Sequence, residues 1–230
     1  MINKSVQEVA YMFNRIASRY DFLNHLLAFG RDKYWRRQLV KEVAKTCPQH
    51  ILDVATGTGD LAFLLYKRTK ATVIGVDVAD GMLDIARKKQ AKKFIPITFM
   101  QATAAALPFP DHSFDVVSIA FGVRNFEHLH EGLYEIRRVL KPGGMVAILE
   151  FTTPHGWPMK PLYRFYSVCI IPLIGRIVSK HASAYSYLPA TIAEFPQREK
   201  FISTLTLLNF KASNYKILTF GICGIYIAKC

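Results

Sequence analysis

The chain has 230 residues, of which 51% are hydrophobic and 20% are charged, a composition typical of one globular domain with a sizeable core. It contains no run of about 18 uncharged apolar residues, so the sequence predicts no membrane-spanning helix, and no signal peptide is visible. The four cysteines are scattered, without a Cys-x-x-Cys pair, which indicates reduced thiols and a cytoplasmic protein.

The net charge of +13 is concentrated at the two ends of the chain. Residues 1–50 hold 9 Lys and Arg against 4 Asp and Glu, residues 51–150 hold 12 against 11, and residues 151–230 hold 9 against 2. Basic flanks around a near-neutral middle suggest an anionic partner, either phospholipid headgroups or nucleic acid. Ordinary solubility charge is the alternative, and the basic run at residues 87–93 is expected on the solvated face of a helix.

Apolar side chains three or four positions apart predict a helix over residues 6–24, and a second helix is expected over residues 35–45. Strands and helices then alternate. Short apolar runs predict strands at residues 50–55, 71–77, 96–101, 113–121 and 145–151. We expect Asp60 and Asp80 to cap two of the intervening helices, and a stop signal with a tight turn at residues 141–144. This alternation predicts a doubly wound α/β fold around a parallel sheet.

The end of the chain follows a different pattern. After a helix near residues 192–208, two apolar runs on either side of Gly221 predict a hairpin, which adds an antiparallel strand to the sheet. The segment before that helix is too long for a simple crossover and is expected to lie over the carboxyl edge of the sheet. We therefore expect a single domain with four parts: a helical cap (1–46), a cofactor-binding core (47–150), a substrate- or membrane-facing insertion (151–200) and a closing helix and hairpin (201–230).

The stretch LDVATGTGDLA, residues 52–62, follows the first predicted strand. Gly57, Gly59 and Ala62 have the spacing of a dinucleotide fingerprint, and Asp77 lies where that fingerprint has an acidic residue. The glycines allow a sharp turn and a close approach of the backbone to a ligand. This spacing does not distinguish a nicotinamide dinucleotide from S-adenosylmethionine.

Two further carboxylates favour S-adenosylmethionine. Asp53 ends the preceding strand and Asp60 lies at the start of the next helix, where a dinucleotide would place its pyrophosphate. Both would repel a pyrophosphate and suit the sulfonium and ammonium groups of S-adenosylmethionine. Asp77 is expected to accept the ribose hydroxyls of either ligand. The alternative for Asp60 is a plain helix cap.

The later motifs strengthen this interpretation. The loop QATAAALPFP follows the third strand, where class I methyltransferases contact adenine, and RVLKPGGMVAILEF is their usual run into the fifth strand. The sequence therefore predicts a class I methyltransferase dependent on S-adenosylmethionine, with a Rossmann-like fold. Its sheet is expected to have seven mostly parallel strands and an antiparallel C-terminal strand.

Three further motifs are more specific: IASRYDFLN, FGVRN and YLPATIAEFP. With them, nearly the whole chain resembles the menaquinone/ubiquinone biosynthesis C-methyltransferases, which methylate a ring carbon of a prenylated quinol. The resemblance implies conversion of 2-demethylmenaquinol to menaquinol, with S-adenosylhomocysteine as the second product. A benzoquinol of the ubiquinone pathway, or another lipid-like small molecule, is the alternative substrate.

The resemblance also implies cofactor contacts. The family's nucleotide contacts fall on Thr58, Asp77, Thr103 and Ala104, in addition to the glycine turn and Asp53. Thr103 departs from the family, which has Asn or Asp there. A threonine hydroxyl is a shorter acceptor for the adenine amino group, so a weaker or different hold on adenine is expected.

Methylation of a quinol carbon requires loss of a proton from the adjacent hydroxyl, which makes that carbon nucleophilic. Arg124, directly after the fourth strand, is expected to stabilise the oxyanion, and Asn125 to donate to the second ring oxygen. Asp21 is a candidate base, and Tyr187 either stacks on the quinol ring or belongs to the core. The alternative for Arg124 is a purely structural pair with Glu150. No His, Cys or Asp cluster has metal-ligand spacing, so no metal is expected.

The implied partners are a prenylated quinol and the inner face of the cell membrane, bound peripherally through basic flanks. The apolar stretch 163–178 is expected to accommodate the prenyl tail. Nucleic-acid methyltransferases would carry [DN]-P-P-[YF] or Pro-Cys, and neither occurs, so no nucleic acid partner is expected. The sequence leaves open whether the protein forms a homodimer.

Overall fold

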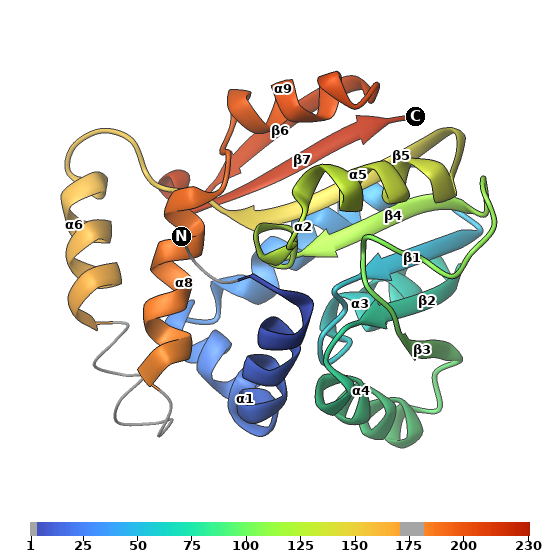
Figure 1. Ribbon diagram of the computed structural model, residues 1–230, viewed down its shortest axis with the longest axis horizontal. Coiled ribbons are helices and arrows are strands. Elements are labelled where there is room, and N and C mark those ends of the chain that lie inside the picture. The colour runs from blue at the N-terminus through green and yellow to red at the C-terminus, as the bar shows by residue number, and fades with distance from the viewer. Residues whose placement is uncertain (1–3, 171–181) are drawn as a thin grey trace.

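Seven strands form one sheet in the order β3-β2-β1-β4-β5-β7-β6 (Figure 1). The structure is a computed structural model and describes residues 4–170 and 182–230. Strands β1 to β5 pair in parallel, and β7 runs antiparallel to both β5 and β6. The predicted seven-stranded, mostly parallel sheet is confirmed. The strands are β1 (His50–Val54), β2 (Thr72–Asp77), β3 (Ile97–Gln101), β4 (Phe114–Ala120), β5 (Leu140–Phe151), β6 (Lys211–Leu218) and β7 (Cys223–Lys229).

Helices cover both faces of the sheet and its carboxyl edge. One face packs against α2, α3 and α4, the other against α5 and α9. Helices α1, α6 and α8 gather beyond the carboxyl ends of the parallel strands (Figure 1). The helices are α1 (Val6–Leu27), α2 (Arg31–Ala44), α3 (Asp60–Thr69), α4 (Asp80–Lys93), α5 (Leu129–Val139), α6 (Met159–Phe165), α8 (Ala182–Glu194) and α9 (Glu199–Leu207).

The two predicted aspartate caps are wrong. Gly59 and Ala79 occupy the cap positions of α3 and α4, and neither offers a side-chain cap. Asp60 and Asp80 are instead the first residues of these helices, where a carboxylate is favourable because the N-terminal end of a helix carries partial positive charge.

The turn expected at residues 141–144 is a bulge inside a strand. Strand β5 begins at Leu140, directly after α5, and its register against β4 shifts between Phe114 and Val116. Gly143 has φ +76°, and its N–H donates to the Cys230 carbonyl at 3.1 Å. The chain therefore changes direction without leaving the sheet, because the C-terminus supplies the hydrogen bond.

The helix predicted near residues 192–208 is two helices. Helix α8 ends at Glu194 and α9 starts at Glu199, with Pro196 between them. Proline lacks the N–H that a continuing helix requires, and Arg198 has φ +57°, so the chain turns sharply here. This turn separates the α8 layer over the carboxyl edge from α9, which packs on the sheet.

Gly59→Ala tests the packing of the glycine turn. Gly59 has φ +83°, and an added Cβ would lie 2.9 Å from the Phe99 ring and 3.0 Å from the Phe63 ring. We expect a loss of about 2–4 kcal/mol in the free energy of unfolding, from backbone strain plus overpacking. In the control Gly143→Ala, φ is also positive but nothing lies within 4 Å of the added Cβ, so about 1 kcal/mol is expected. Urea unfolding measures both, and equal losses would contradict the packing argument.

Candidate active site

A cavity of about 110 Å³ lies at the carboxyl ends of β1, β2 and β4, under α1. We refer to it as the cofactor cavity. Five predicted site residues line it: Gly57, Asp77, Thr103, Ala104 and Asn125. Its volume is below the roughly 300–1,000 Å³ typical of ligand pockets. The described cavity therefore encloses only part of a cofactor of the size of S-adenosylmethionine.

The glycine turn and Asp77 form the floor of this cavity. The Asp77 carboxylate accepts the Gly57 N–H at 2.7 Å and the Ala79 N–H at 2.9 Å. Burial raises the pKa of Asp77, although these backbone donors oppose the change. An added Cβ at Gly57 would meet nothing within 4 Å, so Gly57 leaves open space beside the carboxylate. The site can therefore bring backbone and carboxylate close to a hydroxyl-bearing ligand.

Asp53 lies below the turn and does not line the cofactor cavity. It is 1% exposed, and it accepts hydrogen bonds from the hydroxyls of Thr56 at 2.7 Å and Ser118 at 2.6 Å. Burial raises its pKa to about 6, against the pull of these two hydroxyls. The Gly59 N–H in turn donates to the Thr56 carbonyl at 3.0 Å. Asp53 and Gly59 thus support the turn rather than face a ligand in this conformation.

The Lys89 side chain binds three residues whose proximity the sequence did not predict. Its ammonium lies 2.7 Å from Asp21, 2.7 Å from Asp60 and 2.9 Å from the Thr58 hydroxyl, which donates to Asp21 at 2.6 Å. The expectation that Lys89 is solvated is wrong. None of these residues lines the cofactor cavity. Because Lys89 compensates the carboxylate of Asp60, Asp60 is not the exposed anion that was expected to repel a pyrophosphate.

Helix α1 is fastened over the cofactor cavity at three points. The Val6 N–H donates to Glu127 at 2.9 Å, Asn14 accepts the Gly81 N–H at 2.8 Å, and Asp21 pairs with Lys89. The helix also contributes Val6, Val9, Phe13 and Tyr20 to the cavity wall. The three fastenings therefore set the distance between α1 and the glycine turn.

A second cavity of about 570 Å³ adjoins the first, and we refer to it as the substrate cavity. The two share Phe13, Tyr20 and Phe121 as lining residues. The walls come from α1, α2, α6 and α8 and are mostly apolar; they include Met12, Ile16, Leu23, Leu27, Trp35, Leu162, Phe165, Ile170, Leu188 and Ile192. The contribution of α2 was missed, because only the folded chain brings its first two turns to this edge.

Arg124 lines the substrate cavity and is also paired with Glu150. Its Nη1 lies 2.7 Å from Glu150 Oε1 and also donates to the Phe121 carbonyl, while Glu150 Oε2 accepts its backbone N–H at 3.3 Å. Glu150 is fully buried. Arg124 Nε has no hydrogen-bond partner in the described part of the chain. The pair with Glu150 therefore does not exclude the predicted role of Arg124 in stabilising an oxyanion.

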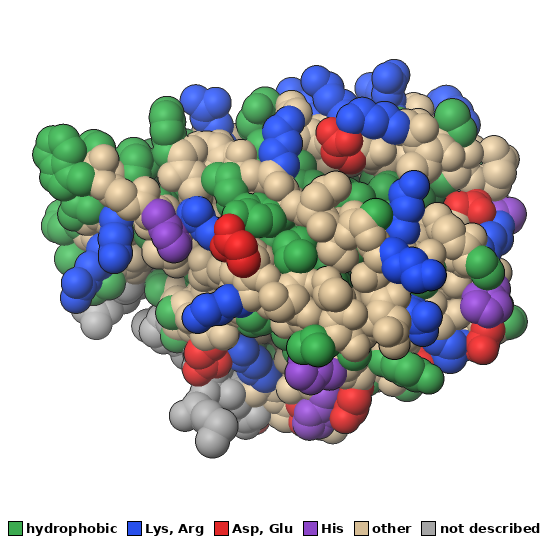
Figure 2. Space-filling view, turned by 90° about the horizontal axis from the view of Figure 1, so that it is seen from above, with side chains coloured by type: hydrophobic (Ala, Val, Ile, Leu, Met, Phe, Trp, Pro, Cys, Tyr) green, Lys and Arg blue, Asp and Glu red, His purple; other side chains and the backbone are tan. Residues whose placement is uncertain are grey.

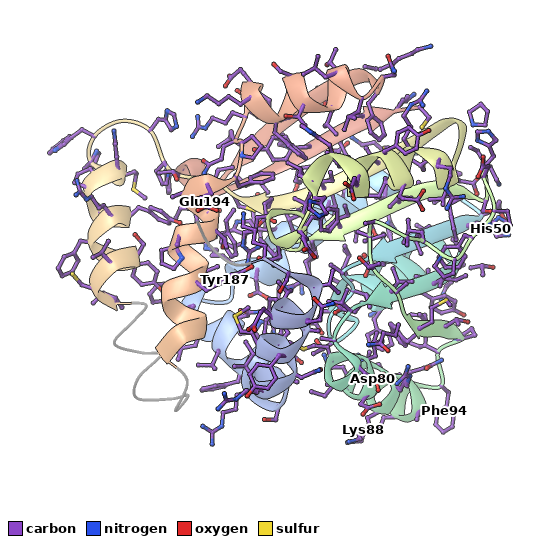
Figure 3. The ribbon with its side chains drawn as sticks, viewed as in Figure 1. His50, Asp80, Lys88, Phe94, Tyr187 and Glu194 are labelled. Carbon is purple, nitrogen blue, oxygen red and sulfur yellow. The ribbon has the colours of Figure 1, made fainter. Side chains whose placement is uncertain are left out.

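Three tyrosines from three helices line the substrate cavity with Arg124 and feel its charge: Tyr20 on α1, Tyr163 on α6 and Tyr187 on α8. Tyr187 is labelled in Figure 3. Burial raises the pKa of each hydroxyl, to about 12 for Tyr163, and the Arg124 cation only partly offsets the rise. The hydroxyls thus remain protonated donors at neutral pH. The Tyr187 hydroxyl is buried without a partner among the residues described.

Residues 171–181 lie outside the described residues, and they include positions 171–178 of the apolar stretch expected to hold a prenyl tail. Within the two described ranges, no group of three His, Cys, Asp or Glu side chains is placed to hold a metal. None of the helices described there combines the length and apolarity needed to cross a bilayer.

The fold and the site together define a class I methyltransferase: a glycine turn after β1, an aspartate ending β2, and a substrate cavity beside the cofactor cavity. S-adenosylmethionine is the methyl donor of this class. More narrowly, the chain belongs to the ubiE/COQ5 methyltransferase family, whose model matches residues 1–229. The predicted family and class are confirmed.

Similar curated proteins cover almost the whole chain. It is 44% identical over 228 residues to the demethylmenaquinone methyltransferase of Bacteroides fragilis, covering 98% of this chain and 93% of the relative. The demethylmenaquinone methyltransferase of Thermus thermophilus is 44% identical over 217 residues, with coverage of 94% and 98%. The ubiquinone/menaquinone biosynthesis C-methyltransferase UbiE of Geobacter sulfurreducens is 44% identical over 224 residues, with coverage of 96% and 87%.

Solved structures with low sequence identity share the fold. A SAM-dependent methyltransferase from Aquifex aeolicus superposes with a TM-score of 0.59 at 19% identity, covering 83% of this chain and 88% of the other. A [4+2]-cyclase superposes with a TM-score of 0.61 at 17% identity, covering 97% and 96%. Because a cyclase has the same architecture, the fold alone does not fix the reaction, which has to be argued from the site.

Asp53→Asn tests the buried carboxyl under the turn. In the folded protein the pKa of Asp53 is about 6, above its ordinary value of 3.8. The Asp53 carboxyl therefore contributes stability that is fully present below pH 3.8 and is lost as the pH rises through 6. We expect the free energy of unfolding of the variant, relative to the parent protein, to rise by about 2 kcal/mol between pH 4 and pH 7.5. Urea unfolding at both pH values measures this; a difference that does not change with pH would contradict it.

Proposed function

We propose that this protein transfers the methyl group of S-adenosylmethionine to a ring carbon of a prenylated quinol, most directly converting 2-demethylmenaquinol to menaquinol in the cytoplasm. The observation that carries the proposal is the buried cation of Arg124 in a large apolar cavity that adjoins the cofactor cavity. The names of the relatives from B. fragilis and T. thermophilus support the naphthoquinol. A benzoquinol is the second candidate, because the equally similar G. sulfurreducens relative is named for both pathways.

The residues of the cofactor cavity fit S-adenosylmethionine, which supplies an electrophilic methyl sulfonium. Asp77 would accept the ribose hydroxyls beside the open space at Gly57. Thr103 and Ala104 would contact the adenine. The Thr103 hydroxyl accepts only a long hydrogen bond of 3.4 Å, from the Ala105 N–H, so it is free to accept a stronger one. This supports the proposal that a threonine can replace the family's Asn or Asp.

The ring is activated by losing the proton of the hydroxyl next to the reacting carbon. Arg124 and the neutral tyrosine hydroxyls are donors to the developing oxyanion in a mostly apolar cavity, where such donors are more effective than in bulk water. The ring carbon then forms a bond to the methyl group as the carbon–sulfur bond breaks. The hydrogen on that carbon moves to the oxygen as aromaticity returns, so one proton is released per turnover.

We propose that the departing proton goes to water rather than to Asp21. Asp21 already binds Lys89 and the Thr58 hydroxyl, and it lines neither cavity. Asn125 lines the cofactor cavity, and its Oδ1 has no partner among the described residues. We propose that Asn125 acts at the boundary between the two ligands rather than deep in the substrate cavity.

Arg124→Lys tests the proposed reaction. Lysine keeps a positive charge beside the buried Glu150 but loses the planar fork of donors. We expect normal binding of S-adenosylhomocysteine and a loss of methyl transfer of at least about 100-fold. The measurement is transfer of label from methyl-labelled S-adenosylmethionine to chemically reduced demethylmenaquinone.

The matched control for this assay is Arg138→Lys, because Arg138 pairs with Glu135 and Asp111 and lines neither cavity. It should retain most of the activity. Labelling of a benzoquinol but not the naphthoquinol would favour the second candidate. Full activity of Arg124→Lys would contradict the role of Arg124.

We also propose that the protein binds an anionic membrane peripherally through an apolar surface near the substrate cavity. This surface comprises Trp157, Phe165, Val168, Phe29 and Phe220, of which Trp157 is 88% exposed. The three phenylalanines also line the cavity. Figure 2 shows hydrophobic side chains gathered at that end of the molecule, with Lys and Arg side chains beside them. A prenyl tail could thus pass from the bilayer to the cavity without crossing water.

Replacing both Trp157 and Phe165 with serine tests the membrane surface. Each aromatic side chain contributes about 1.5–3 kcal/mol when it is buried. We expect co-sedimentation with phosphatidylglycerol vesicles at low salt to weaken by at least about tenfold. Phe94→Ser is the control, because Phe94 is 93% exposed but lies at the opposite side of the molecule (Figure 3). No binding by the parent protein, or an equal loss in the control, would contradict the proposal.

A further inference from the structure

A second arginine–carboxylate pair lies in the substrate cavity, and the reaction described above does not use it. Asp32 and Arg36, one turn apart on α2, both line the cavity and are both buried. Asp32 Oδ2 lies 2.6 Å from Arg36 Nη1 and 2.7 Å from His25 Nδ1. Both partners therefore bind the same carboxylate oxygen, which fixes the orientation of the carboxylate.

The other oxygen, Asp32 Oδ1, has no hydrogen-bond partner in the described parts of the chain. A buried acceptor without a donor is costly and calls for an explanation. The Arg124–Glu150 pair has the complementary feature, since its Arg124 Nε is a buried donor without an acceptor. Besides the Tyr187 hydroxyl, the described part of the cavity thus has an unsatisfied donor on Arg124 and an unsatisfied acceptor on Asp32, each held in a charge-neutralised pair.

The aromatic floor of the cavity connects the two pairs. Phe121 and Phe151 stack with ring centroids 4.5 Å apart. The Arg36 guanidinium lies 5.4 Å from the Phe121 centroid, and that of Arg124 lies 5.4 Å from the Phe151 centroid. One pair therefore adjoins each ring of the stack. The two pairs are thus connected through one aromatic stack in the wall of the cavity.

We propose that Asp32 is a specificity-determining residue that selects the reduced ring over the oxidised quinone. This inference rests on the proposed function. A quinol that has lost one proton has an oxyanion, which matches the donors around Arg124, and a remaining hydroxyl, which can donate to Asp32 Oδ1. A quinone has two carbonyl oxygens and no donor, so one carbonyl would face the carboxylate unpaired. Polar mismatches of this kind discriminate strongly between ligands of the same shape.

Selection of the quinol over the quinone during binding matters because the quinone has no hydroxyl to deprotonate and its ring carbon is not a nucleophile. An apolar cavity alone would admit both redox forms, since they differ little in shape or hydrophobicity. A carboxylate acceptor rejects the unreactive form before it can block the site. A purely structural role, with Asp32 connecting the end of α1 to α2 through His25, predicts no such discrimination.

The test compares binding of a short-chain 2-prenyl-1,4-naphthoquinone with that of its chemically reduced hydroquinone, without oxygen and with S-adenosylhomocysteine present. Titration calorimetry needs no turnover. We expect the parent protein to bind the hydroquinone at least about tenfold more tightly than the quinone. In Asp32→Asn, the amide can donate to a carbonyl, so the ratio should approach one while binding of S-adenosylhomocysteine is unchanged.

His25→Gln is the matched control, because glutamine can still donate to Asp32 Oδ2 and leaves Oδ1 as it is; the ratio should be retained. Equal binding of both redox forms by the parent protein would overturn the selectivity without any variant. A ratio unchanged in Asp32→Asn, with only a loss of stability, would reduce Asp32 to a structural role. Failure of both forms to bind would overturn the proposed function and this inference with it.

Discussion

The buried pair between Arg124 and Glu150 is the interaction on which the site depends. Glu150 lies near the end of β5, where the backbone is fixed by pairing with Gly224 of β7, and it is fully buried. A lone carboxylate there would be strongly destabilising, and Arg124 compensates it with a side-chain and a backbone hydrogen bond. The consequence is a cation inside an apolar cavity that retains an unused donor.

In the proposed function, this pair allows an apolar cavity to favour an anion. The apolar walls suit a prenylated ring, whereas the same walls would raise the pKa of the ring hydroxyl, as they raise that of Tyr163. The Arg124 cation would lower the pKa of a ring hydroxyl that lies beside it. The antiparallel β7 fixes the strand that carries Glu150 and so supports the proposed role of Arg124. Helix α1 lines both cavities, so the contacts that hold it in place help to shape both.

The sequence predicted the sheet because its strands are short apolar runs separated by helical segments, a pattern typical of strands buried on both faces. It also located Gly57, Asp77 and Arg124, because each directly follows or ends a predicted strand and so falls at the carboxyl edge. Lys89 was beyond reach: one lysine in a basic run looks like the others until α1 and α3 bring Asp21 and Asp60 to it. Asp32 and Arg36 could not be recognised as cavity residues either, because charged side chains are common in the first turns of helices.

The most direct measurement is the pKa of a ring hydroxyl bound next to Arg124. A short-chain prenylated 1-naphthol suits this purpose, because it carries one hydroxyl, is not oxidised as readily as a quinol, and changes its absorbance when it ionises. The naphthol is bound together with S-adenosylhomocysteine and titrated with base. The pKa of its hydroxyl should lie at least about one unit below the pKa of the same hydroxyl in water, because the Arg124 cation favours the oxyanion. A pKa equal to or above that in water, as burial alone would produce, would contradict the central role of Arg124.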